Sequence, residues 1–200
     1  MLTLSLTIWI FIPLPGAAFN ASHNYSFLVV FLFSGLNSYA IILAGLASNS
    51  RYSLIGGIRA IAQVISYEIP LSISMLTFAC IESCFNLYNF AHSSAIFYMI
   101  SIPSLIVFFI SLLAETNRTP FDLPEAEAEL VAGYNLEYSS ILFSLFFLAE
   151  YSNMLVAASL LSLMLSNDHF YISVILFCFV FIVIRAILPR YTFKQLIALA

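Results

Sequence analysis

Residues 27–48, FLVVFLFSGLNSYAIILAGLAS, decide the fold class. They contain no charged side chain, and they form a run longer than the roughly 20 residues that a membrane-spanning helix needs. Across the whole sequence, 62% of the residues are hydrophobic and only 8% are charged. A soluble protein of 200 residues could not cover its surface with so few polar groups. The composition therefore indicates that lipid surrounds much of this chain.

The apolar runs predict helices and not a membrane barrel, because they lack the even polar and apolar alternation of barrel strands. We expect a single all-α membrane domain over residues 1–200, a multi-spanning transmembrane helix bundle of about five full helices and a partial first one. The partial helix lies within 1–14, where Pro13 ends an apolar run that is too short to cross a bilayer. The full helices are expected over 27–48, 60–80, 95–114, 139–165 and 170–188.

Basic side chains gather on one side of the membrane if these helices alternate in direction. The connections on the other side carry acidic residues and histidines but no Lys or Arg. This asymmetry predicts that the basic side faces the matrix or the cytoplasm. The residues on that side are Arg51, Arg59, Arg118, Arg185, Arg190 and Lys194.

The connection over residues 115–138 is strongly acidic and contains a single cation, Arg118. A solvated acidic loop is one interpretation. A short helix at the membrane surface, docked on a partner, is favoured by the apolar residues between the acids and by Pro124, which suits a first helical turn. The acidic residues of this loop are Glu115, Asp122, Glu125, Glu127, Glu129 and Glu137.

Two further acids, Glu68 and Glu150, lie inside expected membrane helices, roughly 13 to 17 Å from the basic side. An ionised carboxylate at that depth is costly unless it is paired, hydrated or protonated, so such residues commonly mark a proton or substrate path. Pro70 removes a backbone hydrogen bond close to Glu68 and favours an opening there. The structural alternative is a protonated carboxyl group that is hydrogen-bonded to a neighbouring helix.

Other site classes are not indicated. No basic patch suitable for nucleic acid is present. Cys80, Cys84 and Cys178 lack the paired spacing and companion histidines of a zinc or iron-sulfur site, so we expect no metal.

Three motifs carry a family resemblance: SNSRYSLIGGIRAIAQVISYEIP at 48–70, AETNRTPFDLPEAEAELVAGYNLEY at 114–138 and FFLAEYSN at 146–153. In this order they resemble the subunit 1 family of respiratory NADH:ubiquinone oxidoreductase (complex I), which has a bacterial equivalent. The similarity extends from about Trp9 to Leu196. Family members usually place an acid where this chain has Lys194.

The resemblance implies roles for individual residues, none of them directly catalytic. The quinone channel and acidic loop would use Arg118, Asp122, Glu125, Glu127, Glu129 and Phe146. The proton path would use Glu68, Glu137 and Glu150. Supporting charges would be Arg59, Glu115, Arg185 and Arg190.

The resemblance also implies a function that this chain performs only within an assembly. It would line the ubiquinone channel and couple quinone reduction by NADH to proton translocation. NADH, FMN and iron-sulfur clusters would be held by partner subunits, which would include two hydrophilic quinone-site subunits and neighbouring membrane subunits. The expected location is the mitochondrial inner membrane, with the gene in the organelle. Since this sequence begins after the family's leading helices and stops before its last helix, we expect separate chains to supply them. A truncated chain and a misassigned start are the alternatives.

Three other interpretations remain open. The chain could be the membrane anchor of an energy-converting hydrogenase, a related protein that passes electrons to protons. It could be an independent proton or ion transporter that uses Glu68 and Glu150. It could also be a purely structural membrane scaffold.

Overall fold

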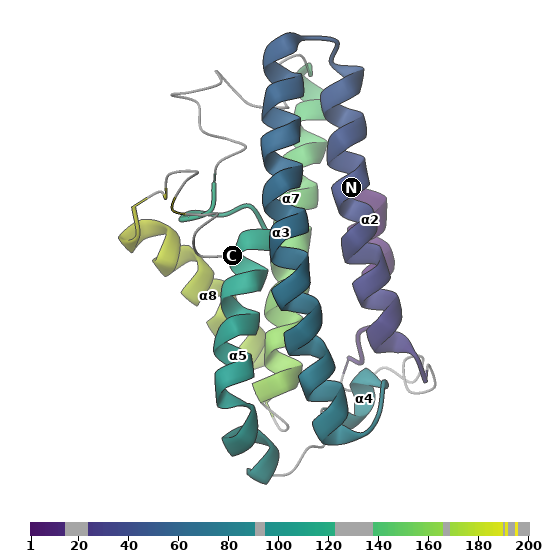
Figure 1. Cartoon of the computed structure of the whole chain (residues 1–200), viewed down its shortest axis with the longest axis vertical. Coiled ribbons are helices and arrows are strands. Elements are labelled where there is room, and N and C mark those ends of the chain that lie inside the picture. The colour runs from purple at the N-terminus through teal and green to yellow at the C-terminus, as the bar shows by residue number, and fades with distance from the viewer. Residues whose placement is uncertain are drawn as a thin grey trace.

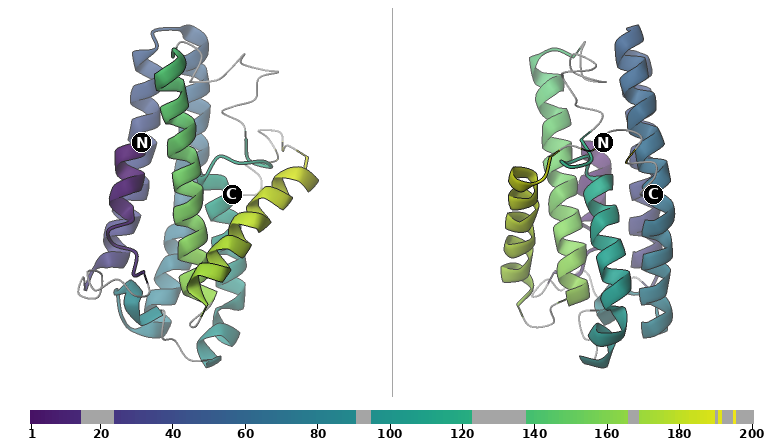
Figure 2. Two further views of the ribbon diagram at one scale, coloured as in Figure 1. Left: turned by 180° about the vertical axis from the view of Figure 1, so that it is seen from behind. Right: turned by 60° about the vertical axis from the view of Figure 1, so that its left-hand side comes forward.

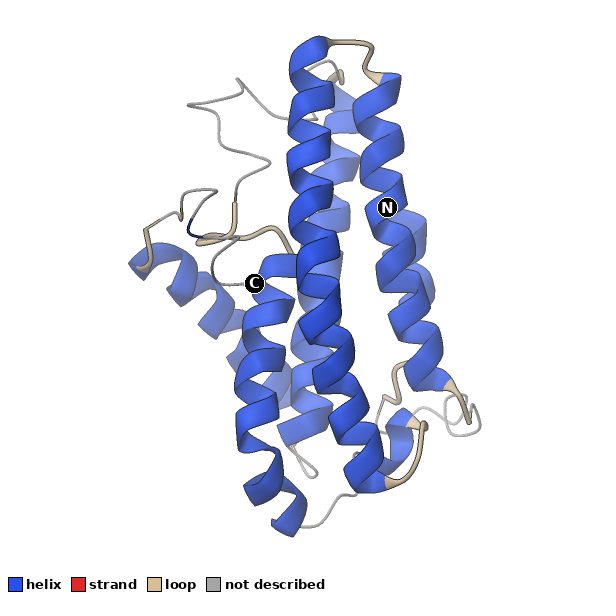
Figure 3. Ribbon diagram, in the orientation of Figure 1, coloured by secondary structure: helices blue, strands red, loops and turns tan. Residues whose placement is uncertain are grey.

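The computed structural model describes residues 1–14, 24–90, 95–122, 138–165, 169–189, 191 and 195, with only the backbone for Asn89 and residues 95–99. Within these ranges all regular secondary structure is helical (Figure 3). The helices are α1 (Leu2–Ile8), α2 (Ser26–Ala47), α3 (Arg51–Glu82), α4 (Leu87–Phe90), α5 (Ala95–Glu115), α7 (Ser140–Leu165) and α8 (Phe170–Ile187).

Four of these helices, α2, α3, α7 and α8, are long and apolar enough to cross a membrane. In α5 the apolar stretch with described side chains, Ile100–Glu115, is shorter. Many large hydrophobic side chains of the long helices point outward. Together these features confirm the predicted all-α bundle that spans the membrane several times.

Helix α3 is longer than the expected segment 60–80, since it begins at Arg51 and ends at Glu82. The Ser50 side chain caps its start by accepting a hydrogen bond from the Ser53 backbone N–H at 3.3 Å. The sequence-based boundary was wrong because Gly57, which is weakly helix-forming, lies within the helix. Its lack of a side chain lets α3 approach Gly45 of α2 closely, so packing outweighs propensity.

The first helix is shorter than the expected segment 1–14. Helix α1 ends at Ile8, and the following residues form tighter turns, in which the Ile10 and Phe11 N–H groups donate to carbonyls three residues earlier. The chain therefore leaves the helix well before Pro13. Even so, α1 is integrated into the bundle, where it packs against α7 and α2.

Helices α2, α3 and α7 run along the long axis of the molecule (Figure 1). Helix α5 packs along α3 but ends beside its middle, and α8 crosses α7 obliquely (Figures 1 and 2). Buried aromatic and aliphatic side chains of α3, α5 and α7 form the main core. The polar end of α5 is thus brought against the interior of α3, and this contact positions the candidate site.

Candidate functional site

The site begins at the turn that follows α5. Gln63 of α3 is 1% exposed, and its side-chain amide donates to the carbonyl oxygens of Ala114, at 3.0 Å, and Phe121, at 2.7 Å. The same amide donates to the Asn117 side chain at 3.2 Å. Asn117 adopts a left-handed backbone conformation with φ of 51°, which reverses the chain. One buried amide therefore holds both sides of the turn that carries Arg118.

Arg118 points from this turn into the protein and meets Glu150 of α7. Its Nη2 atom lies 3.8 Å from Oε2 of Glu150, and the two residues are only 5% and 8% exposed. The guanidinium group also lies 4.4 Å from the centre of the Tyr151 ring, within the range of a cation–π contact. The pairing compensates two buried charges that would each be costly alone.

Glu68 and Glu115 form a second acidic centre between α2, α3 and α5. Both side chains line a small cavity, together with Ser34 and Tyr67, and its free volume of about 10 Å³ is roughly that of one water molecule. The Ser34 hydroxyl, which donates to the Phe31 carbonyl oxygen at 2.8 Å, faces the same cavity. The two carboxyl groups are close enough to repel each other when both are ionised. The two carboxyl groups therefore belong to one site.

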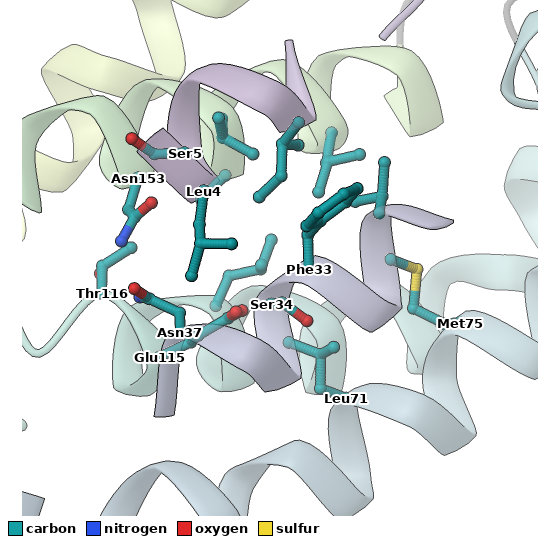
Figure 4. Close-up of a pocket in the computed structure, with 16 residues that line it drawn as sticks. Leu4, Ser5, Phe33, Ser34, Asn37, Leu71, Met75, Glu115, Thr116 and Asn153 are labelled. Atoms are coloured by element: carbon teal, nitrogen blue, oxygen red, sulfur yellow. The ribbon is translucent and has the colours of Figure 1, made fainter. Parts of the chain in front are cut away.

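A larger cavity lies among α1, α2, α3, α5 and α7 (Figure 4). Ser5, Asn37, Glu115 and Asn153 gather near one another, whereas the remainder of the lining is largely apolar. The free volume of about 30 Å³ can hold roughly two water molecules. The buried Oδ1 atom of Asn37 has no hydrogen-bond partner within the described residues, as expected for a group that binds water.

Glu115 connects the two cavities, because it lines both of them together with Ser34 and Leu71. Asn153 lies on the opposite wall of the larger cavity, one helical turn from Glu150. Polar groups therefore extend from Glu68 through Glu115 toward the part of α7 that carries Glu150.

Comparison with known proteins decides the family. A model of the NADH dehydrogenase family matches residues 1–200. The chain belongs to this family. Among its relatives, NADH-ubiquinone oxidoreductase chain 1 of Triticum aestivum is 43% identical, covering 98% of this chain and 66% of the relative. The same-named protein of Phascolarctos cinereus is 40% identical, covering 99% and 66%. A bacterial NADH-quinone oxidoreductase subunit, from Rhodospirillum rubrum, is 39% identical, covering 98% and 64%.

These comparisons confirm the predicted resemblance to complex I subunit 1. This member of the NADH dehydrogenase family spans slightly less than two thirds of the length of the relatives named here. Within the described ranges, no three His, Cys, Asp or Glu side chains come together as they would around a metal ion.

The remaining candidate residues of this family member occupy different surroundings. Asp122 is 5% exposed and follows the Arg118 turn. Phe146 packs against Tyr138, whose hydroxyl donates to the Ala44 carbonyl and so ties the start of α7 to α2. Arg59 is half-buried and Arg185 is exposed. The other candidates, Glu125, Glu127, Glu129, Glu137 and Arg190, lie outside the described residues.

Sequence reasoning missed two features of the site. Glu115 was expected to be a supporting charge of the acidic loop, but it shares a cavity with Glu68. Gln63 was not expected to hold the Arg118 turn. A signal for the cavity was present in α2, where Ser34 and Asn37 interrupt an apolar helix at a spacing of three residues and so share a face.

Proposed function

We propose that this chain is a membrane subunit of respiratory complex I that borders the ubiquinone channel and couples quinone reduction by NADH to proton translocation. The observation that carries the proposal is the pair of adjoining cavities that join at Glu115 and contain both Glu68 and Glu115. The names of the relatives, which are NADH-ubiquinone and NADH-quinone oxidoreductase polypeptides, supply the reaction. The chain acts only within the assembly.

In this proposal the acidic loop is the first part of the chain to respond to the charge changes of quinone reduction. Reduction of a quinone to a quinol consumes protons as well as electrons, so it changes the charge near the channel. Channel residues in this proposal are Arg118, Asp122, Glu125, Glu127, Glu129 and Phe146. Arg118 is suited to transmit the change, since its turn is held by Gln63 while its guanidinium group contacts Glu150.

Electrostatic coupling then carries the change inward. At an effective dielectric constant near 20, two charges about 8 Å apart interact by roughly 2 kcal/mol, which shifts a protonation equilibrium more than tenfold. A change at the Arg118–Glu150 pair would therefore alter the proton affinity of the neighbouring groups. Water in the two cavities offers a route for proton exchange with Glu115 and Glu68. In this scheme Glu137 connects the acidic loop to the same path.

The proposed location is the mitochondrial inner membrane, with Arg51 and Arg59 toward the matrix. Partner subunits carry the flavin and the iron-sulfur clusters, and two hydrophilic partners form most of the quinone site. Arg185 and Arg190 lie on the matrix side and complete the supporting charges together with Arg59 and Glu115.

The proposal is tested by purifying the native assembly that contains this chain, identifying its subunits by mass spectrometry and measuring NADH oxidation by quinone in proteoliposomes. We expect mass spectrometry to identify the redox subunits of complex I. We also expect quinone reduction to change the pH inside the proteoliposomes in step with turnover. Hydrogen evolution without quinone reduction would instead identify a hydrogenase anchor. Proton transport by the isolated chain without redox partners would support an independent transporter.

A further inference from the structure

Gly35 of α2 lies directly opposite Glu68 of α3. A Cβ atom added to Gly35 would lie 2.6 Å from Oε1 of Glu68 and 3.7 Å from its carboxyl carbon. The first distance is far shorter than a van der Waals contact. The Glu68 carboxylate therefore occupies the space that a side chain at position 35 would fill.

Backbone conformation does not explain this glycine, because position 35 lies within the continuous helix α2. A glycine inside a helix lowers helix stability relative to alanine. A spatial requirement is the remaining explanation, and the Glu68 carboxylate is the group that fills the space.

The Glu68 carboxylate lies between two open spaces, a cavity and a groove. On the inner side, Glu68 lines the small cavity with Ser34 and Glu115. On the outer side, it lines an open groove between α2 and α3, together with Gly35 and Tyr39. A side chain at position 35 would press the carboxylate away from this location and so change its relation to Glu115.

We propose that Gly35 is a positioning residue, which keeps the Glu68 carboxylate between the helices and within reach of the cavity that it shares with Glu115. The consequence for proton translocation rests on the proposed function. The placement of the carboxylate does not rest on the proposed function, so this placement can be tested separately.

The test compares Gly35→Ala with Gly35→Ala/Glu68→Asp in the assembled complex. The shorter aspartate withdraws its carboxylate from the added methyl group and should relieve the clash. A matched control is Gly45→Ala on the same helix, where the new Cβ would meet the Gly57 Cα and the Ser53 carbonyl oxygen at 3.4 Å, the short limit of an ordinary contact. This control alters α2–α3 packing without touching Glu68.

Two measurements are made on each variant. The infrared carboxyl stretch of the acid at position 68, isolated by subtracting the Glu68→Gln spectrum, reports the surroundings of that group without turnover. Quinone-linked proton translocation reports function. We expect Gly35→Ala to shift the infrared band and to lower translocation by about tenfold or more, since a misplacement of about 1 Å can slow a reaction by up to about a hundredfold. The double variant should recover a large part of the lost translocation. Gly45→Ala should leave both the infrared band and the translocation unchanged.

An unchanged infrared band and unchanged translocation in Gly35→Ala would overturn the inference. Equal defects in Gly35→Ala and the double variant would also overturn it, because the role of Gly35 would then be helix packing alone. A shifted band with normal translocation would support the positioning and refute the part of Glu68 in the proposed proton path. If Gly35→Ala does not assemble, recovery of assembly in the double variant supports the inference, and no recovery overturns it.

Discussion

Arg118 and Glu150 are each surrounded by protein and approach one another from different elements, a turn and a long helix. Removing one partner of a buried ion pair leaves the other charge uncompensated, and that effect commonly exceeds the net stabilisation from the intact pair. The contribution of these two residues is therefore best measured by changing them singly and together.

Arg118→Met is expected to destabilise the assembled protein by about 3 kcal/mol, because Glu150 loses its counter-charge in a buried place. Arg118→Met/Glu150→Gln should be more stable than the single variant, since no unpaired charge remains. Thermal unfolding of the purified complex, followed by loss of the native assembly, measures the difference. Equal stability of the two variants would show that Glu150 without its counter-charge carries no penalty, and would contradict this explanation.

Glu150→Gln keeps the size and hydrogen-bonding capacity of the side chain but removes its charge. We expect the complex to assemble, although less stably because Arg118 loses its counter-charge. Quinone-linked proton translocation should fall about a hundredfold or more, the loss that is typical when a positioned proton-transfer group is removed. Proton uptake by proteoliposomes during NADH oxidation measures the effect. Glu82→Gln, at the far end of α3 and outside the described cavities, is the control. Normal coupled turnover in Glu150→Gln would argue against a role for this residue.

At the scale of elements, the contact between α3 and the turn after α5 depends on a single side chain. The Gln63 amide donates to three oxygen atoms, two of them backbone carbonyls. These bonds cross more than fifty positions of sequence, so they join the two elements and do not merely stabilise one helix. The direction of Arg118 follows from this contact.

Gln63→Glu replaces the donating amide by an acceptor that faces three other acceptors. We expect it to destabilise the complex by about 2 kcal/mol, the size of penalty seen when buried polar groups lose their partners. Gln63→Met, which fills the same space without polar atoms, should cost less. Thermal unfolding gives the order of stability, and proteolytic cleavage near Arg118 reports opening of the turn. A Gln63→Met variant less stable than Gln63→Glu would contradict this explanation.

The boundaries of the helices are harder to predict than their existence. The long apolar runs identified α2, α3, α7 and α8 as candidate spans because length and hydropathy determine what can cross a bilayer. The predicted start of α3 was misplaced because glycine is a weak helix former, although Gly57 here allows α2 and α3 to pack closely. Propensity acts over a few residues, whereas this contact depends on another helix.

For the whole molecule, the unequal lengths of the helices decide where the polar groups lie. Helix α5 ends beside the middle of α3, so the turn after it enters the bundle at the depth of Gln63 and does not emerge at its end (Figure 1). The acidic and basic groups of that turn consequently meet the interior of α3 and α7. The site exists because one helix is shorter than its neighbours.

The orientation of the whole chain in the membrane can be measured directly. With the three native cysteines replaced by alanine, we expect Tyr52→Cys to react with an impermeant thiol reagent from the matrix side and Phe85→Cys to react from the opposite side. Both side chains are exposed, and they lie near opposite ends of α3. The expectation follows from the concentration of basic residues near Tyr52. Labelling of both cysteines from one side, or in the reverse order, would contradict the topology.

The sequence alone determined that this chain is a bundle of apolar helices with acids at unusual depth, and its motifs indicated the family. Those properties depend on composition, run length and residue order, which can be read along the chain. Only the tertiary structure decided that Arg118 pairs with Glu150, that Glu115 shares a cavity with Glu68 and that Gly35 leaves room for a carboxylate. Each of these contacts joins residues distant in sequence, and helix register and packing, which local patterns do not specify, bring them together.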